Sequence, residues 1–409
     1  MSKKHIIILA EEYWHTVETP KHKFIEAKYL LNEIRDNNKY EIVILKTPGE
    51  LLSKINSIGN HNIKAIFIFQ DILSDSYLNK KSIVEMKNIM YQLTDKHNVN
   101  IYPGIEMTNT FASKRYYLDL INMMPYSVLP GSQVYKIKYK RGDEYKIKNN
   151  LYKLSQDMLK KFDKIVIKKG YSYSGVQVRT FNRELLNDKN KFLKRLDQLN
   201  FKYFFDQGTN ANFWEQGITR YYILQGYNRV IKNRMNEYRV FFFGGIAKYI
   251  AWGDDIPNLC TSDYETETDK SNYSSTDSNV DDDYEALNKD DKNIKKLNNL
   301  NPALGREVLR FAKRVYEDYL KIFWKNDLIQ HPIIFRVDVS YALAEEFIDE
   351  HAINISGFDD KVRLYVNELE IDPTNYFYNN IICKKEREIN NKYVQTLTGK
   401  LINEYIANI

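Results

Sequence analysis

The chain has 409 residues, of which 43% are hydrophobic and 28% charged, and its formal net charge is +6 at pH 7. This length predicts two or three domains, and the modest positive charge favours anionic ligands without choosing among them. Only two cysteines are present, which argues against a disulfide framework and a cysteine metal site. No run of residues approaches the roughly 20 apolar residues of a membrane span, so we expect a cytoplasmic protein.

Strands and helices alternate over residues 1–125, at the start of the chain. Short apolar runs rich in β-branched residues predict strands at residues 6–10, 41–45, 63–69 and 100–102. Apolar residues at helical spacing predict helices at residues 24–34, 50–58 and 82–93. Because this alternation is typical of a parallel sheet with helices on its faces, we expect an α/β domain. No Gly-rich turn follows the first strand, so a dinucleotide-binding fingerprint is absent.

Residues 126–228 predict a second unit, of α+β type. A helix is expected just before it, at residues 111–124. From residue 134 to residue 148, apolar and basic residues alternate around Arg141 and Gly142, and this pattern predicts a β-hairpin. Further strands are expected at residues 164–168, from residue 176 onwards and at residues 221–225. Further helices are expected at residues 151–162 and 183–199.

Residues 229–409 predict a third unit with a polar insertion. Its expected elements are a hairpin of strands 237–243 and 246–252, a helix at 303–323, strands at 333–339 and 364–371, and a closing helix at 387–406. Residues from about 262 to 298 are rich in Ser, Thr, Asn, Asp and Glu and poor in large apolar residues. Such a segment cannot bury enough apolar surface to fold, so we expect it to be a disordered insertion.

A lysine ends the strand expected at residues 164–168, and a loop of small residues follows it. The loop runs from Lys169 through Gly170 and several serines to Gly175. An ammonium group is a point charge for phosphate oxygens, and glycines let backbone N–H groups approach them closely. The segment is therefore a candidate phosphate-binding flap, although a surface hairpin with a flexible tip is the commoner meaning of such a loop when it stands alone.

Two further strands carry polar residues at informative positions. The strand expected at residues 221–225 ends in Gln225, and its backbone could serve the edge of an adenine ring, although an ordinary core strand is the simpler interpretation. In the strand expected at residues 237–243, Glu237 and Arg239 share a face because strand side chains alternate. These two side chains predict either a plain ion pair or contacts with a nucleotide and a substrate.

The last two strands carry the most specific pattern. Arg336 and Asp338 share one strand face, and Glu368 and Glu370 share another. If the strands are neighbours, three carboxylates converge, which is costly unless a cation neutralises them. Mg²⁺, or Mn²⁺ in its place, takes hard oxygen ligands of this kind. An exposed charged sheet face is the alternative, but the strongly apolar flanking residues favour a half-buried metal site.

Taken in this order, these segments resemble the ATP-grasp superfamily, in particular its carboxylate–amine ligases of the D-alanine–D-alanine ligase and glutathione synthetase type. The resemblance covers about residues 1–375 and implies an ATP-grasp fold, in which an N-terminal parallel-sheet domain precedes two α+β subdomains that hold ATP between two sheets. Lys169 stands where the family usually has proline, Gln225 where it has glutamate, and Glu370 where it has asparagine. The positions that the resemblance assigns to ATP binding are Lys114, Lys168, Lys169, Gly170, Ser172, Ser174, Gly175, Gln225, Gly226, Tyr227 and Glu237.

The resemblance also implies an activity. ATP and Mg²⁺ would activate a small carboxylate as an acyl phosphate, which an amine or a thiol then attacks. Asp338, Glu368 and Glu370 would hold the metal, and Arg336 and Arg239 would stabilise negative charge.

Two alternatives to the ligase stay open. The first is an inositol-phosphate kinase of the same fold, which the positive net charge suits. The second is a non-catalytic nucleic-acid-binding protein, which the alternating Tyr and Lys residues of segment 134–148 would suit. Because such alternation more often marks a solvated hairpin, nucleic acid is not an expected partner. A homodimer is the default oligomer, since dimers are the commonest soluble assemblies.

Overall fold

In the structure, a computed structural model, the described residues form three β-sheets, and the chain divides into two units. The first unit comprises Met1–Thr108, Tyr238–Asp338 and Leu369–Ile409, and the second comprises Asn109–Glu237 and Val339–Glu368. The residues that the structure describes are 4–9, 30, 33–34, 39–45, 48–69, 80–112, 114–138, 143–170, 178–197, 199, 219–228, 237–252, 272–275, 302–324, 333–343, 350–371, 396 and 398–408.

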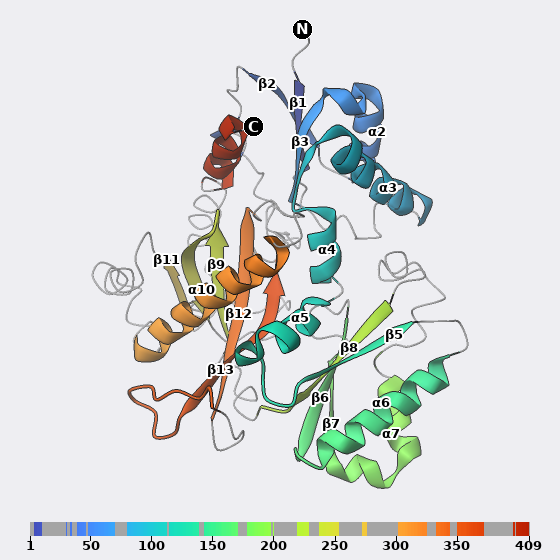
Figure 1. Cartoon of the computed structure of the whole chain (residues 1–409), viewed down its shortest axis with the longest axis vertical. Coiled ribbons are helices and arrows are strands. Elements are labelled where there is room, and N and C mark those ends of the chain that lie inside the picture. The colour runs from blue at the N-terminus through green and yellow to red at the C-terminus, as the bar shows by residue number, and fades with distance from the viewer. Residues whose placement is uncertain are drawn as a thin grey trace, which may run out of the picture. The chain divides into compact units, whose positions relative to one another are not determined.

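The first unit begins with a parallel sheet. Its strands are β1 (Lys4–Leu9), β2 (Tyr40–Leu45), β3 (Ile63–Ile68) and β4 (Asn100–Tyr102), in the order β2-β1-β3-β4. The neighbouring strands pair in parallel. The helices α2 (Pro48–Ile58) and α3 (Lys80–His97) lie beside this sheet (Figure 1). The predicted α/β start of the chain is therefore confirmed, while most of the helix predicted at 24–34 lies outside the described residues.

A second sheet has the order β11-β10-β9-β12-β13. Its strands are β9 (Glu237–Phe243), β10 (Ile246–Trp252), β11 (Asn272–Ser275), β12 (Ile334–Leu343) and β13 (Val362–Glu370). The helix α10 (Pro302–Trp324) packs on one face of this sheet, where Tyr316 stacks on Phe242 with ring centroids 4.5 Å apart and meets Phe335 edge-on at 5.1 Å. Strand alternation therefore places the side chains of Arg239, Arg336 and Asp338 on the face opposite α10.

One apolar cluster joins these elements within the first unit. Ile6 and Phe67 come from the parallel sheet, Phe243 and Ile334 from β9 and β12, and Ile402 from the C-terminal helix at residues 398–408. All five side chains are buried. Burying one such side chain contributes about 1.5–3 kcal/mol, so the cluster holds the two sheets and the terminal helix together.

The second unit is built on an antiparallel sheet. The strands β5 (Gln133–Lys138), β6 (Lys164–Lys169), β7 (Val178–Asn182) and β8 (Thr219–Gly226) lie in the order β5-β8-β6-β7. The helices α6 (Glu144–Leu159) and α7 (Lys189–Asp197) cover one face (Figure 1). Leu151 of α6 and Phe192 of α7 share a core with Ile167 of β6 and Leu224 of β8.

The other face of this sheet, which we call the open face, carries Lys168 and Gln225. Along β6, Ile165 and Ile167 belong to the core under the helices, so the alternate residue Lys168 points the opposite way. Lys168 pairs with Ile223 of β8, and Val166 pairs with Gln225. Because cross-strand partners share a face, Lys168 and Gln225 lie on the same side of the sheet.

The single helix predicted at residues 111–124 is wrong. Two helices occupy this region, α4 (Ile105–Ala112) and α5 (Tyr116–Met123), and a 3₁₀ turn, η3 (Pro125–Ser127), follows. The interruption falls at Lys114, whose φ is 54°. A residue in this left-handed region cannot continue a right-handed helix, so the chain changes direction there.

The β-hairpin predicted at residues 134–148 is also wrong. Strand β5 pairs with β8 instead, and residues from Glu144 onwards form α6. Ile147 and Leu151 are four residues apart and both buried, whereas Tyr145 is 66% exposed, which is helical periodicity. The short alternation of apolar and basic residues is compatible with a hairpin or with a strand followed by a helix. The pairing of β5 with the distant strand β8 selects the second. The nucleic-acid alternative loses the hairpin on which it depended.

Other predicted segments lie outside the described residues. They are the loop at 171–177, the insertion at 262–298 apart from β11, and the closing helix before residue 396. Among the helices that are described, none has the length and apolar character needed to span a bilayer.

The turn between β9 and β10 allows a stability test. Gly244 and Gly245 have φ angles of 56° and 87°, and a Cβ atom on Gly244 would lie 2.6 Å from Leu401 Cδ2. We expect Gly244→Ala to lower the free energy of unfolding by about 1–2 kcal/mol, because alanine is strained in the left-handed region. Chemical denaturation measures the change. The control is Gly104→Ala, whose Cβ would meet only Ile101 O at 3.9 Å, and an equal loss there would contradict the prediction.

Candidate active site

Lys168 is the centre of a hydrogen-bonded group in the second unit. Its Nζ donates to Asn367 Oδ1 at 2.8 Å and to Tyr117 Oη at 3.5 Å. Asn367 Nδ2 donates in turn to Glu237 Oε2, and Tyr117 Oη donates to the Asn367 carbonyl. Asn367, on β13, therefore forms hydrogen bonds with the ammonium group of Lys168, the carboxylate of Glu237 and the phenol of Tyr117.

Lys169 differs from its neighbour. It is 3% exposed and lies on the face of β6 that carries Ile165 and Ile167. Its cross-strand partner is Tyr222, which belongs to the core under α6 and α7. Of the two adjacent lysines, Lys168 is thus the one on the open face. The role of either lysine at a phosphate stays a prediction.

Lys114 forms an ion pair with Glu368, the residue that follows Asn367 on β13. The Lys114 side chain is 9% exposed and that of Glu368 is 26% exposed. The interruption between α4 and α5 positions Lys114, because its left-handed backbone turns the chain at this point. Lys114 and Lys168 therefore come from different elements and reach consecutive residues of one strand.

Gln225 is a buried polar residue of the open face whose side-chain amide lacks a hydrogen-bond partner among the described residues. It is 3% exposed, and within the described part of the chain its Nε2 has no hydrogen-bond partner. A buried donor without an acceptor costs about 1–3 kcal/mol. A ligand that offers an acceptor on this face would remove that cost.

The open face near α5 is partly desolvated. Burial raises the pKa of Tyr221 on β8, the nearby Arg115 guanidinium lowers it, and the Asp119 carboxyl raises it. Burial also raises the pKa of Asp119 itself, while Arg115 lowers it. Charged groups interact more strongly where water is excluded, so nearby cations would attract an anion bound on this face more strongly than they would in water.

A second polar group lies in the first unit. Asp338 is 1% exposed, and its two carboxylate oxygens accept from Arg336 Nε at 2.6 Å and from Arg336 Nη2 at 2.8 Å. Arg239 Nε lies 3.8 Å from Asp338 Oδ2. The predicted sharing of a face by Arg336 and Asp338 is confirmed by this bidentate contact. Two guanidinium groups thus lie around one carboxylate.

The three predicted metal ligands have carboxylate oxygens, the donor type that Mg²⁺ prefers. Asp338 belongs to the first unit and is bound by Arg336, whereas Glu368 belongs to the second and is paired with Lys114. Among the described residues, no three His, Cys, Asp or Glu side chains are grouped so that they could hold a metal ion. The assignment of Asp338, Glu368 and Glu370 to a metal stays a prediction.

The remaining predicted contacts are distributed as follows. Gly170 N donates to Tyr221 O at 2.8 Å, and Tyr227 N donates to Lys164 O at 2.9 Å, so both N–H groups serve the sheet. Gly226 ends β8 and pairs with Ile165. The loop positions Ser172, Ser174 and Gly175 lie outside the described residues.

Sequence analysis missed Tyr117 and Asn367. Tyr117 follows Lys114 by three residues, and Asn367 directly precedes Glu368. Because strand side chains alternate, Asn367 points away from the face that Glu368 and Glu370 share. The signal that could have identified Asn367 is its place in the strand, between an apolar run and two acids.

No protein-family model matches the chain, and no curated protein matches it. Among solved structures it is similar to the D-cycloserine synthetase DcsG, with 12% identity, a TM-score of 0.46, and coverage of 97% of this chain and 99% of that one. It is similar to D-alanine–D-alanine ligase from Bacillus anthracis complexed with ATP, with 11% identity, a TM-score of 0.45 and full coverage (100%) of both chains. A third is the ATP-grasp ligase PsnB complexed with a minimal precursor, Mg and ADP, with 8% identity, a TM-score of 0.44, and 97% and 99% coverage. The chain thus resembles solved ATP-grasp ligases over nearly its whole length. This likeness concerns the fold alone.

The link between Lys168 and Asn367 can be measured directly. We expect Lys168→Met and Asn367→Leu to be coupled in a double-mutant cycle by about 0.5–3 kcal/mol, because each change removes one partner of the same hydrogen bond. Denaturant unfolding of the four proteins gives the coupling energy. The exposed pair Lys160 and Asp157, with side chains 74% and 69% exposed, is the control and should show almost no coupling. Additive effects at Lys168 and Asn367 would rule out the link.

Proposed function

We propose that the protein is an ATP- and Mg²⁺-dependent ligase of the ATP-grasp type, which activates a small carboxylate and joins it to an amine. The observation that carries the proposal is the open face of the second unit. It combines Lys168, held by Asn367 at 2.8 Å, with the buried amide of Gln225, whose Nε2 has no partner in the described part of the chain. A nucleotide offers both phosphate oxygens for an ammonium group and ring nitrogens for an amide donor.

The second unit would bind the nucleotide. Lys168 and Lys114 would donate N–H groups to phosphate oxygens, as point charges that need no fixed orientation of the phosphate. Gln225 would donate to a ring nitrogen of adenine, which would satisfy its buried N–H group. Glu368, Asp338 and Glu370 would offer carboxylate oxygens to Mg²⁺. The metal, when bound, supplies positive charge to the phosphate oxygens.

The first unit would bind the carboxylate. Arg336 is 4% exposed, and the Nε and Nη2 atoms of its planar guanidinium group donate to Asp338, which shows that its geometry matches a carboxylate. Arg239 lies on the same side of Asp338, with its side chain 24% exposed. Both groups would also stabilise the negative charge that develops on the acyl oxygen during transfer.

The proposed reaction balances in two steps. A carboxylate oxygen attacks the γ-phosphorus, the bond from that phosphorus to the bridging oxygen breaks, and ADP leaves with the electron pair. An amine nitrogen then attacks the acyl carbon, the bond from that carbon to the phosphate oxygen breaks, and the nitrogen loses a proton. Positioning and fixed charges supply the catalysis, since no protein atom becomes covalently bound.

Hydroxylamine trapping tests this function without knowledge of the natural amine. The protein is incubated with ATP, Mg²⁺, hydroxylamine and each member of a panel of small carboxylic acids. We expect one or more acids to give a hydroxamate in equal amount to ADP, because hydroxylamine intercepts an acyl phosphate. ADP formation with inositol phosphates, together with no hydroxamate from any acid, would replace the ligase with the kinase alternative.

Gln225→Leu gives a test with two opposite effects. In the free protein we expect unchanged or higher thermal stability, because the change removes a buried donor that lacks an acceptor. For Mg-ATP we expect affinity to fall by about 2- to 13-fold, since one hydrogen bond contributes about 0.5–1.5 kcal/mol. Thermal unfolding and calorimetric titration measure the two quantities. The control is Gln133→Leu, at an exposed position of β5, and unchanged ATP affinity in Gln225→Leu would remove Gln225 from the site.

A further inference from the structure

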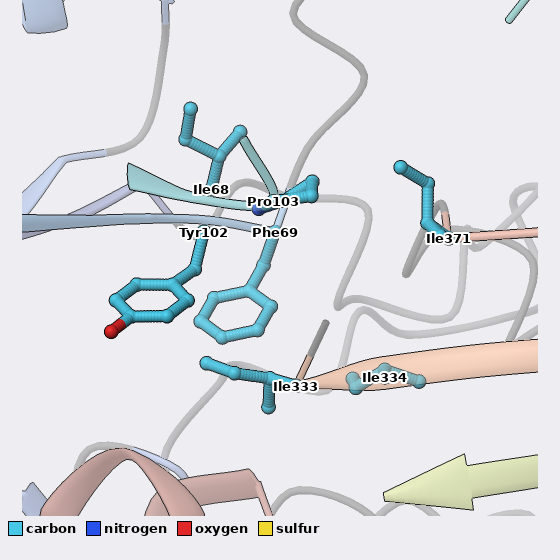
Figure 2. Close-up of a pocket in the computed structure, with 7 residues that line it drawn as sticks. All are labelled: Ile68, Phe69, Tyr102, Pro103, Ile333, Ile334 and Ile371. Atoms are coloured by element: carbon cyan, nitrogen blue, oxygen red, sulfur yellow. The ribbon is translucent and has the colours of Figure 1, made fainter. Parts of the chain in front are cut away.

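A small pocket in the first unit is part of the apolar core. Figure 2 shows the residues that line it, which are Ile68, Phe69, Tyr102, Pro103, Ile333, Ile334 and Ile371. Four of them, Phe69, Tyr102, Ile333 and Ile334, also belong to the buried cluster that joins the sheets of this unit. No side chain of this lining is charged, so the pocket offers no cation to a phosphate. The second unit, in contrast, holds Lys168 in a defined network of hydrogen bonds.

Tyr117 contacts Lys168 in two ways within the second unit. The Lys168 Nζ lies 3.5 Å from Tyr117 Oη and 5.7 Å from the centroid of the Tyr117 ring. The face of a tyrosine ring attracts a cation that lies within about 6 Å of its centroid. The ammonium group of Lys168 therefore meets both an oxygen lone pair and the electron-rich face of one side chain.

The direction of each hydrogen bond around Lys168 follows from the groups involved. The main-chain carbonyl of Asn367 can only accept, so the Tyr117 hydroxyl donates to it and presents its lone pairs to Lys168. The ionised carboxylate of Glu237 also only accepts, so the Asn367 amide directs its nitrogen to Glu237 and its oxygen to Lys168. Lys168 thus donates to two oxygen atoms whose orientations are set by other bonds.

Strand β13 holds the segment that contains α5 and η3 at both of its ends. Before α5, Lys114 pairs with Glu368. After α5, Arg363 Nη2 donates to the carbonyl oxygens of Pro125 and Val128, at 3.0 and 2.8 Å. Residue numbers rise along this segment while those of its partners fall along β13, so the segment runs antiparallel to the strand.

The anchor that Arg363 provides limits the movement of Tyr117. Arg363 is 1% exposed, and a buried guanidinium group is costly unless it is hydrogen-bonded. Carbonyl groups at the end of a helix lack partners within the helix, so they are suitable acceptors for it. Tyr117 itself is fully buried, and its ring stacks on Tyr116 with centroids 5.0 Å apart. The Tyr117 hydroxyl therefore occupies a defined position beside β13.

We infer that Tyr117 is a positioning residue that orients the ammonium group of Lys168 toward the phosphate groups of a nucleoside triphosphate. This inference rests on the proposed function and names the residue that prepares its phosphate contact. A free lysine side chain has many conformations, and fixing one of them before the ligand arrives lowers the entropic cost of binding. Because a phenol is neutral, Tyr117 fixes the ammonium group without cancelling the charge that attracts phosphate.

The first experiment measures the position of Lys168 without any ligand. The full-length protein and Tyr117→Phe, which keeps the ring and removes the hydroxyl, are treated briefly with an amine-acylating ester, and mass spectrometry gives the rate at each lysine. We expect the rate at Lys168 to rise about 2- to 13-fold in the variant, the equivalent of one lost hydrogen bond. The adjacent Lys169, which is 3% exposed, is the internal control and should keep its rate. An unchanged rate at Lys168, or an equal rise at Lys169, would overturn the inference.

The second experiment measures phosphate affinity. Calorimetric titration with inorganic tripolyphosphate and with Mg-ATP compares the unchanged protein with Tyr117→Phe and Tyr116→Phe. Tyr116→Phe is the matched control, because it removes a hydroxyl from the neighbouring buried ring of α5. We expect Tyr117→Phe to lower both affinities about 2- to 13-fold and Tyr116→Phe to leave them unchanged. Equal losses in the two variants would mean a general structural effect and would refute the positioning role.

The two experiments together separate this inference from the proposed function. Binding of tripolyphosphate and Mg-ATP with the same affinity in Tyr117→Phe would refute the inference and leave the nucleotide site in place. Faster acylation of Lys168 in Tyr117→Phe, in a protein that binds neither tripolyphosphate nor Mg-ATP, would support the link from Tyr117 to Lys168 and refute the ligase.

Discussion

An ammonium group that is largely removed from water must be held by oxygen atoms, and this constraint organises the second unit. Lys114 is 7% exposed, so an unpaired charge there would cost several kcal/mol. Strand β13 supplies the oxygen atoms for both lysines, through the carboxylate of Glu368 for Lys114 and the amide of Asn367 for Lys168. The positions of the two cations are therefore fixed by one strand, although the lysines are 54 residues apart in the sequence.

Asn367 is suited to this role because its side chain both accepts and donates. Its oxygen accepts from Lys168, and its nitrogen donates to Glu237. A carboxylate at this position could accept from the lysine but would repel Glu237, and an apolar residue could do neither. The neutral amide thus keeps a cation and an anion in fixed positions without cancelling either charge.

Much of this could be predicted from the sequence, where local pattern and tertiary structure agree. The long apolar strands and the Gly244-Gly245 turn lie close to their predicted positions, and Lys168 lies on the predicted strand, while its role stays a prediction. The failures share a cause. Segment 134–148 has a local alternation that fits a strand or a helix, and only pairing of β5 with the distant β8 distinguishes them. No glycine or proline marks the helix interruption at Lys114 in the sequence. The role of Asn367 becomes visible only in the folded chain, where Lys168 donates a hydrogen bond to it.

The buried charges of the first unit are not explained by stability. Arg336 and Asp338 stand on a strand whose other residues include Phe335, Val337 and Val339, all fully buried. Replacing a buried ion pair by apolar residues of similar volume is often neutral or stabilising, because desolvation offsets the attraction between the charges. The pair therefore weakens an otherwise apolar strand or adds little to it. A second guanidinium group, from Arg239, lies 3.8 Å from Asp338, so the carboxylate is held from two strands, β9 and β12. In a setting of low dielectric constant, these charges interact far more strongly than they would in water, so the two arginines and Asp338 keep one another in place.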